Sequence, residues 1–306
     1  MDNNEKNENK QLKLIKTIKD IHTGRINYVD CFPSGNLISV SDDYSINIYD
    51  KDFNIIQKII NAHNHGITFV NVKDENNFVT CSGDKKIKTW KKEENIFIEN
   101  IIISDAHNEK IFKVNYIKGD KLISCSEDET IKFWEKINEK YQNITSLQSK
   151  GRIYTFLYLE DKKIIVVGGD NGTIIYNMIT FEIIKTFDDT FCGSWNSLIR
   201  IDDDRILVQT RYINSMISVI SIQGKCIFLL FLNEFQFLGI GLIKEKNIFI
   251  VGGMESMIKV YSSNDYYCIQ TIQDAHDDYI VGFLVLENNL ILSYSQDRKI
   301  KVWSFN

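Results

Sequence analysis

Residues 105–134 read DAHNEKIFKVNYIKGDKLISCSEDETIKFW, and this stretch sets the pattern for the rest of the chain. Apolar and polar residues alternate from Ile111, a polar KGDK segment follows, and two further apolar runs lead to Trp134. This pattern predicts three short strands separated by turns. The same pattern returns at residues 61–90, NAHNHGITFVNVKDENNFVTCSGDKKIKTW, and at residues 274–303, DAHDDYIVGFLVLENNLILSYSQDRKIKVW. Self-similarity of this kind indicates a repeat architecture.

The spacing of the repeated residues predicts seven units of roughly 40 to 45 residues. The aromatic residues that close the third strands are Tyr49, Trp90, Trp134, Tyr176, Tyr261 and Trp303. The gap between Tyr176 and Tyr261 leaves room for one degenerate unit. The predicted units start near residues 20, 61, 105, 148, 187, 233 and 274. An opening histidine is absent from the fourth to sixth units, so divergence is concentrated in one contiguous part of the chain.

A unit of this length with four strands, an opening His and a closing Trp is typical of a propeller blade. From about residue 12 to residue 306 the chain resembles the tryptophan-aspartate (WD) repeat family. The resemblance implies an all-β fold, a single seven-bladed β-propeller of four-stranded antiparallel blades. Residues 12–19 resemble the segments before the other histidines, and the last unit ends after its third strand. We therefore expect the N-terminal strand to pair with the last blade and close the ring, so that residues 11–306 form the propeller and residues 1–10 a disordered tail.

The composition favours a globular protein of the cytoplasm, or alternatively of the nucleus. Hydrophobic residues make up 43% of the 306 residues, the net charge is -5, and the basic residues are dispersed, so we do not expect a nucleic-acid partner. The six cysteines form no C-x-x-C pair, which indicates reduced thiols and neither a disulfide framework nor a zinc site. The most apolar run, residues 226–243, is interrupted by Asn233, Glu234 and Gln236, which argues against insertion into a membrane. We expect no metal and no cofactor.

Four units repeat the same set of polar and aromatic residues. The sets are His22, Ser39, Asp43 and Tyr49; His63, Thr80, Asp84 and Trp90; His107, Ser124, Asp128 and Trp134; and His276, Ser293, Asp297 and Trp303. A single Ser, His and Asp combination would suggest a hydrolase triad. An active site is needed once, whereas a structural device is needed in every blade, so we interpret the sets as structural. The family resemblance implies a hydrogen-bonded row from indole to hydroxyl to imidazole to carboxylate, with Tyr49 in place of Trp in the first unit.

The resemblance also implies where a partner binds. In this family the binding site commonly lies at the channel mouth, on the face built from the loops before the first strands and after the second strands. Matching position to position, the rim of this face comprises Asn27, Asp42, Thr68, Phe112, Glu127, Tyr154, Asn196, Met254, Val281 and Gln296. The aromatic residues and Met are enriched at interfaces and are candidates for partner contact, with packing between blades as the alternative. The turns between first and second strands are polar, so we expect that opposite face to be only solvated.

The sequence thus predicts a non-catalytic scaffold or adaptor that binds a peptide or protein partner within a larger complex. One alternative is the substrate receptor of a ubiquitin ligase, but the Trp-Asp-x-Arg tetrapeptide that such family members often carry is absent from the ends of the blades. The other alternative is an enzyme with a site at the channel mouth. The predicted rim supplies only Asp42 and Glu127 as acids for such a site.

Overall fold

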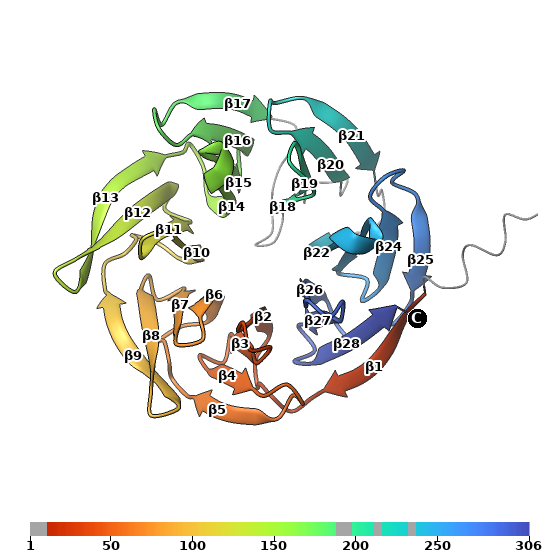
Figure 1. The fold of residues 1–306 in the computed structure, drawn as a ribbon, viewed down its shortest axis with the longest axis horizontal. Coiled ribbons are helices and arrows are strands. Elements are labelled where there is room, and N and C mark those ends of the chain that lie inside the picture. The colour runs from red at the N-terminus through yellow and green to blue at the C-terminus, as the bar shows by residue number, and fades with distance from the viewer. Residues whose placement is uncertain (1–10, 188–197, 211–215, 232–236, 306) are drawn as a thin grey trace, which may run out of the picture.

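The strands of the computed structural model form a ring of blades around a central axis (Figure 1). The structure describes residues 11–187, 198–210, 216–231 and 237–305. Within these residues there are seven four-stranded antiparallel sheets, so the predicted seven-bladed propeller is confirmed. The predicted tail, residues 1–10, lies outside the described residues. In each blade the first strand is innermost and the last strand is outermost (Figure 1).

The first four blades follow the chain order of their strands. Blade 1 comprises β2 (Ile26–Cys31), β3 (Leu37–Ser41), β4 (Ile46–Tyr49) and β5 (Ile55–Ile59). Blade 2 comprises β6 (Ile67–Asp74), β7 (Asn77–Ser82), β8 (Ile87–Glu93) and β9 (Ile96–Ile103). Blade 3 comprises β10 (Ile111–Ile117), β11 (Lys121–Ser126), β12 (Thr130–Ile137) and β13 (Lys140–Gln148). Blade 4 comprises β14 (Ile153–Leu159), β15 (Ile164–Gly169), β16 (Gly172–Asn177) and β17 (Ile183–Phe187).

The last three blades include the one that joins the two ends of the described chain. Blade 5 comprises β18 (Leu198–Arg200), β19 (Arg205–Thr210), β20 (Met216–Ser221) and β21 (Cys226–Phe231). Blade 6 comprises β22 (Phe237–Ile243), β23 (Ile248–Gly253), β24 (Ile258–Ser262) and β25 (Cys268–Ile272). Blade 7 comprises β26 (Ile280–Val285), β27 (Ile291–Ser295), β28 (Ile300–Phe305) and β1 (Leu12–Ile18).

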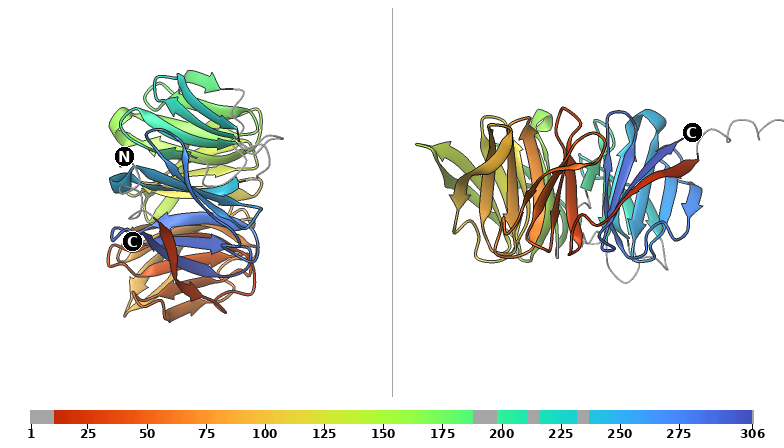
Figure 2. Two further views of the ribbon diagram at one scale, coloured as in Figure 1. Left: turned by 90° about the vertical axis from the view of Figure 1, so that its right-hand side faces the viewer. Right: turned by 90° about the horizontal axis from the view of Figure 1, so that it is seen from below.

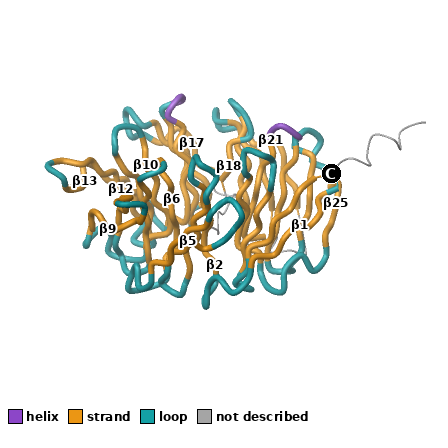
Figure 3. The backbone as a smooth tube through the Cα atoms, turned by 60° about the horizontal axis from the view of Figure 1, so that its bottom comes forward, coloured by secondary structure: helices purple, strands orange, loops and turns teal. Residues whose placement is uncertain are grey.

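The described connections between strands lie on two faces of the ring, as the side views show (Figure 2). The loops before the first strands and the turns after the second strands form one face, which we call the histidine face. The turns between first and second strands and between third and fourth strands form the other, which we call the turn face. Two short 3-10 turns, Glu160–Lys162 and Lys244–Lys246, lie on the turn face (Figure 3). No helix among the described residues is long and apolar enough to cross a membrane.

The core lies between neighbouring blades because each blade is covered by the next one. The second strands are almost entirely buried, as β3 and β27 are over their whole length, whereas the outermost strands such as β5 are largely exposed. An inner strand covered on both sides requires apolar residues on both of its faces. Phe78 and Trp90 of blade 2, for example, pack against Ile38 of blade 1.

The N-terminal strand closes the ring, as the sequence predicted. β1 pairs with β28 in antiparallel register, with Leu12 opposite Phe305 and Ile18 opposite Ile300. The side chain of Gln270 in blade 6 forms two hydrogen bonds with the start of this strand. Its Oε1 accepts a hydrogen bond from the Leu12 amide at 2.8 Å, and its Nε2 donates one to the Leu12 carbonyl at 3.1 Å. β1 is therefore held both within its own blade and from the neighbouring blade.

Candidate functional site

Four blades contain a buried row of hydrogen bonds between residues of the repeated sets. In blade 2 the Trp90 indole donates to Thr80 at 2.9 Å, Thr80 Oγ1 lies 2.8 Å from His63 Nε2, and His63 Nδ1 lies 3.0 Å from the Asp84 carboxylate. Blade 3 gives 2.9, 2.7 and 2.9 Å for the corresponding pairs, and blade 7 gives 2.8, 2.6 and 2.8 Å. The structure thus brings together residues that are up to 27 positions apart in the chain, as His276 and Trp303 are.

The direction of each row follows from the hydrogen-bonding capacity of its groups. The indole N–H can only donate, so the hydroxyl accepts from Trp and donates its own proton to His Nε2. The imidazole is then neutral, and its Nδ1–H donates to the carboxylate. Burial lowers the pKa of His63, His107 and His276, which keeps these rings neutral near pH 7. Burial would raise the pKa of Asp84, but the bonds from His63 and the Asn64 amide together lower it to about 2.

Blade 1 has the same row with a phenol in place of the indole. Tyr49 OH lies 2.8 Å from Ser39 Oγ, which in turn lies 2.7 Å from His22 Nε2. His22 Nδ1 lies 3.0 Å from Asp43 Oδ2. The row is therefore complete, and burial raises the pKa of Tyr49 to about 12, so the phenol stays protonated and able to donate.

Each row joins two loops of the histidine face and leaves no reactive group open to a substrate. The carboxylate also accepts the backbone amide that follows the histidine, for example Asn108 N to Asp128 at 2.9 Å. The central hydroxyl has a partner on both sides and is fully buried, as Ser124 and Ser293 are. A hydrolase serine must instead present its oxygen to the substrate. The rows therefore stabilise the loops, and the described residues contain no group of three His, Cys, Asp or Glu side chains placed to hold a metal ion.

Comparison with known families agrees with this geometry. The family model described as WD domain, G-beta repeat matches the chain at residues 12–50, 54–91 and 99–135. The chain therefore contains WD repeats and folds as a seven-bladed β-propeller. Each matched stretch begins with the outermost strand of one blade and ends with the third strand of the next, so the sequence repeat is offset from the structural blade by one strand. No curated protein matches the chain.

Five of the predicted rim residues of the WD-repeat propeller occupy a β-bulge in the first strand. The register between first and second strands skips one residue in these blades, and the skipped residues are Asn27, Thr68, Phe112, Tyr154 and Val281. A bulge adds one residue to a strand and changes the direction of its side chain. Here the extra side chain contacts the next blade: Asn27 Nδ2 donates to the Ile67 carbonyl and Thr68 Oγ1 to the Ile111 carbonyl, each at 2.7 Å.

This bulge corrects part of the predicted contact surface. Asn27, Thr68 and Phe112 are buried, so they hold blades together and present almost no surface to a partner. Phe112 packs against Tyr154 of blade 4 with ring centroids 5.1 Å apart. Tyr154 remains partly exposed and donates from its hydroxyl to Asp170 Oδ1 at 2.7 Å. Val281 is partly exposed and packs against the core between blades 7 and 1.

The other predicted rim residues lie in the turns after the second strands. Asp42 and Gln296 are exposed, and Glu127 and Met254 are half-buried. Asn196 lies outside the described residues. The accessible part of the predicted rim therefore consists mainly of turn residues and not of first-strand residues.

Charged side chains of alternating sign lie on the histidine face of blades 1, 3 and 4. We call this set the charged arc, and it consists of Arg25, Asp42, Lys110, Glu127, Arg152 and Asp170. Arg25 Nε lies 3.2 Å from Asp42 Oδ2, and Arg152 lies 3.4 Å from Glu127 Oε1 and 3.8 Å from Asp170 Oδ2. Lys110 links the two halves: burial lowers its pKa, and Asp42 and Glu127 oppose that change.

The basic members of the arc were not predicted from the sequence, although the repeat contains a signal for them. Arg25, Lys110 and Arg152 each precede the first residue of a first strand. In each case the carbonyl of the basic residue accepts the amide of the acidic partner in the turn after the second strand, at 3.0, 2.9 and 2.9 Å. Alignment of the residue before the first strand would have identified a basic position in three of the first four blades. In blade 2 the residue before the first strand is Gly66 and the residue after the second strand is Gly83, so this blade has no charged pair at these two positions.

Next to the arc, the histidine face is hollowed between blades 7 and 1. The hollow has a volume of about 670 Å³ and is lined by Thr23, Gly24, Arg25, Asp42, Asp277, Asp278, Gln296, Asp297, Arg298 and Lys299. Lys299 forms an ion pair with Asp277 at its edge. Because the lining is polar and carries both signs of charge, the hollow suits a polar segment better than an apolar one.

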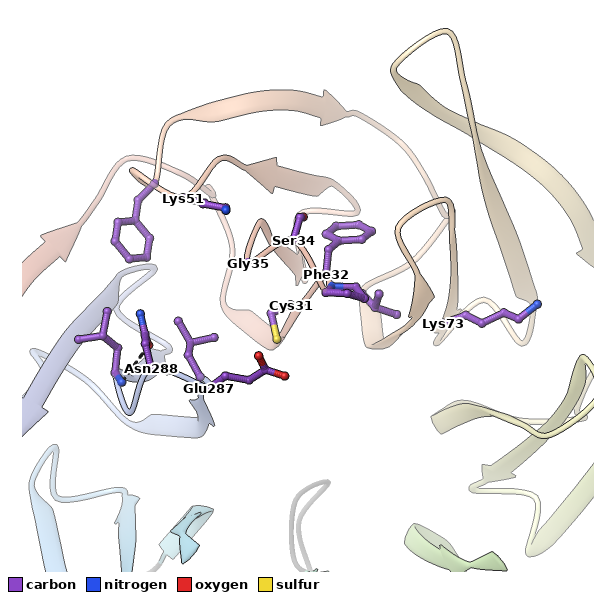
Figure 4. A pocket seen from close by; sticks show the side chains of 13 residues that line it. Cys31, Phe32, Ser34, Gly35, Lys51, Lys73, Glu287 and Asn288 are labelled. Atoms are coloured by element: carbon purple, nitrogen blue, oxygen red, sulfur yellow. Dashed lines mark hydrogen bonds between the residues drawn. The ribbon is translucent and has the colours of Figure 1, made fainter. Parts of the chain in front are cut away.

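The turn face is not uniformly polar, which contradicts the expectation that it is only solvated. A pocket of about 510 Å³ lies between the turns of blades 7, 1 and 2, and Phe32, Phe53, Val72, Leu286 and Leu290 contribute apolar side chains to it (Figure 4). The sequence suggested polar turns because PSGN and ENN are polar. The apolar residues that flank these turns come together only when the ring closes.

Proposed function

We propose that this WD-repeat propeller is a non-catalytic protein-interaction scaffold that binds a peptide or protein partner on its histidine face, as a subunit of a larger complex. Propellers with WD repeats commonly serve as such scaffolds, and the repeats here supply a rigid ring with structural polar networks in four blades. The fold alone does not determine the partner, so the proposal depends on the surface that the ring presents.

The charged arc is the observation that carries the proposal. Its members pair basic with acidic side chains in blades 1, 3 and 4, and several are accessible: the side chains of Arg152, Asp42 and Glu127 are 54%, 43% and 34% exposed. Exposed ion pairs of this kind add little to folding stability. Charges arranged together on one face instead give a partner of complementary charge both orientation and a faster encounter. The adjoining polar hollow extends the same surface toward blade 7.

The arc also argues against a catalytic role for the rim carboxylates. Asp42 and Glu127 are each paired with an arginine, Arg25 at 3.2 Å and Arg152 at 3.4 Å. A general acid or base would instead have to direct its carboxyl group toward a substrate. An interaction surface has no such requirement.

Affinity purification from the native cell with a charge-exchanged variant tests the proposal. In the double variant Glu127→Lys/Arg152→Glu the two side chains can still pair, while the polarity that they present to a partner is reversed. The matched control Glu160→Lys/Lys162→Glu makes the same exchange on the turn face of blade 4, where both residues are exposed. We expect one set of co-purifying proteins to disappear with the first variant and to remain with the control. Retention of the full set by the first variant, confirmed to be folded, would show that the histidine face is not the contact surface.

A further inference from the structure

The pocket on the turn face has the shape of a binding site for a large side chain. It lies between the turn before β27 in blade 7, the turns of blade 1 and the first strand of blade 2. Phe32 forms part of its wall and is itself only 3% exposed, so this wall is fixed by the core. A volume of about 510 Å³ falls within the range of about 300 to 1,000 Å³ that is usual for specific sites.

The charged side chains that line this pocket include both signs of charge. Lys51 and Glu287 both line it, both are exposed, and neither forms an ion pair or side-chain hydrogen bond with the described residues (Figure 4). Most other charged side chains nearby are engaged, as Lys73 is by Asp120 and Lys16 by the Asp52 carbonyl. The pocket therefore has one basic and one acidic group available to a ligand.

The acidic side of the pocket extends below its surface. Asp30 lies next to Cys31 in the chain, and its carboxylate accepts the amides of Val72 and Cys31 at 2.7 and 2.9 Å. Burial raises the pKa of the Cys31 thiol to about 11, with further contributions from Asp30 and Glu287. The thiol that lines the pocket is thus protonated and inert near pH 7, and the site favours recognition over covalent chemistry.

We propose that this pocket binds a second protein partner: an extended segment that inserts a large apolar side chain between Phe53 and Leu290 and places an acidic residue beside Lys51 and a basic residue beside Glu287. The charged groups Lys51 and Glu287 can pair with residues on either side of the inserted apolar side chain. A polypeptide has such flanking residues, whereas a compact apolar molecule does not. Since the pocket opens on the turn face and the charged arc lies on the histidine face, the ring can hold two partners at once. This site does not depend on the contact proposed for the histidine face.

Short synthetic peptides and the full-length protein provide the test. A set of fluorescent peptides carries a central Trp or Ala, flanked by Glu on one side and Lys on the other in both chain orders, with spacers of varied length. We expect Trp-centred peptides of one charge order to bind about tenfold more tightly than their Ala counterparts. We expect the other charge order to be weaker by about threefold, as surface charge pairs are worth.

The double variant Lys51→Glu/Glu287→Lys should bind the opposite charge order better, because it exchanges the two rim charges and leaves the apolar walls intact. The control Glu160→Lys/Lys162→Glu on the same face and the arc variant Glu127→Lys/Arg152→Glu should both bind as the wild type does. Equal binding of Trp and Ala peptides, including no binding of either, would overturn the proposal. So would a charge preference that the exchange leaves unchanged, or apolar binding with no charge preference, which would indicate a small-molecule site.

Discussion

The substitution Thr80→Val tests the role of the buried rows most cleanly. Thr80 is fully buried, and its hydroxyl accepts from the Trp90 indole at 2.9 Å and bonds to His63 Nε2 at 2.8 Å. Valine has nearly the same shape but no hydroxyl, so both ring nitrogens lose their partner inside the protein. An unsatisfied buried group costs about 1 to 3 kcal/mol, so two of them should lower the free energy of unfolding by about 2 to 6 kcal/mol.

Two controls separate the hydroxyl from the volume. Thr80→Ser keeps the hydroxyl and loses one methyl group, which should cost about 1 kcal/mol. Thr89→Val in the same blade also replaces a buried threonine, but it removes only one acceptor, that of the Ile101 amide at 3.1 Å, and should cost about 1 kcal/mol. Urea unfolding at neutral pH, followed by Trp fluorescence and compared at equal m-values, measures all three. The reasoning is refuted if Thr80→Val is as stable as Thr80→Ser.

Three further predictions concern pH, ring closure and the arc. Acid should destabilise the folded ring in two steps. Below about pH 6.5 the unfolded chain binds protons at His63, His107 and His276, whose buried rings stay neutral in the folded chain, and between about pH 4 and 2 it also binds protons at Asp84 and Asp297, whose pKa values in the folded chain are about 2. A denaturation midpoint that stays constant from pH 7 to 4 would contradict this prediction. Gln270→Leu removes both hydrogen bonds to the Leu12 backbone and should speed amide exchange in β1 by about tenfold. The control Gln57→Leu removes the equivalent pair of hydrogen bonds to the Phe97 backbone, so it should speed exchange in β9 and leave β1 protected. Gly66→Ala places a Cβ 2.5 Å from Asp42 Oδ1 and should displace that carboxylate. We expect partner binding to weaken several-fold with only a small change in melting temperature. Unchanged binding would show that Asp42 is not part of the contact surface.

The blades could be predicted because a unit that recurs along the chain carries the same information several times. The spacing from His22 to His63 and from Trp90 to Trp134 gave the period, and the resemblance of residues 12–19 to the other outermost strands gave the closure of the ring. Both are confirmed by the sheet order, in which β1 pairs with β28. Blade 5 was the hardest to place because Ile220 occupies the position at the end of the third strand that is aromatic elsewhere.

The contact surface could be predicted only in part, for two physical reasons. Strict alternation assigns residues to the two sides of a strand, and one bulged residue reverses the assignment beyond it. Asn27, Thr68 and Phe112 fall on such bulges and therefore face the next blade. The pocket on the turn face arises from residues as distant as Phe32 and Leu290, which no local pattern connects.

Hydrogen–deuterium exchange of the propeller, free and bound to the partner that affinity purification retrieves, tests the central claim most directly. If the histidine face is the contact surface, the amides protected by the partner should cluster in the loops of the arc, around residues 23–27, 42–45, 108–112, 127–130, 151–154 and 170–172. Protection confined to the outermost strands, or to the turn face alone, would contradict the account.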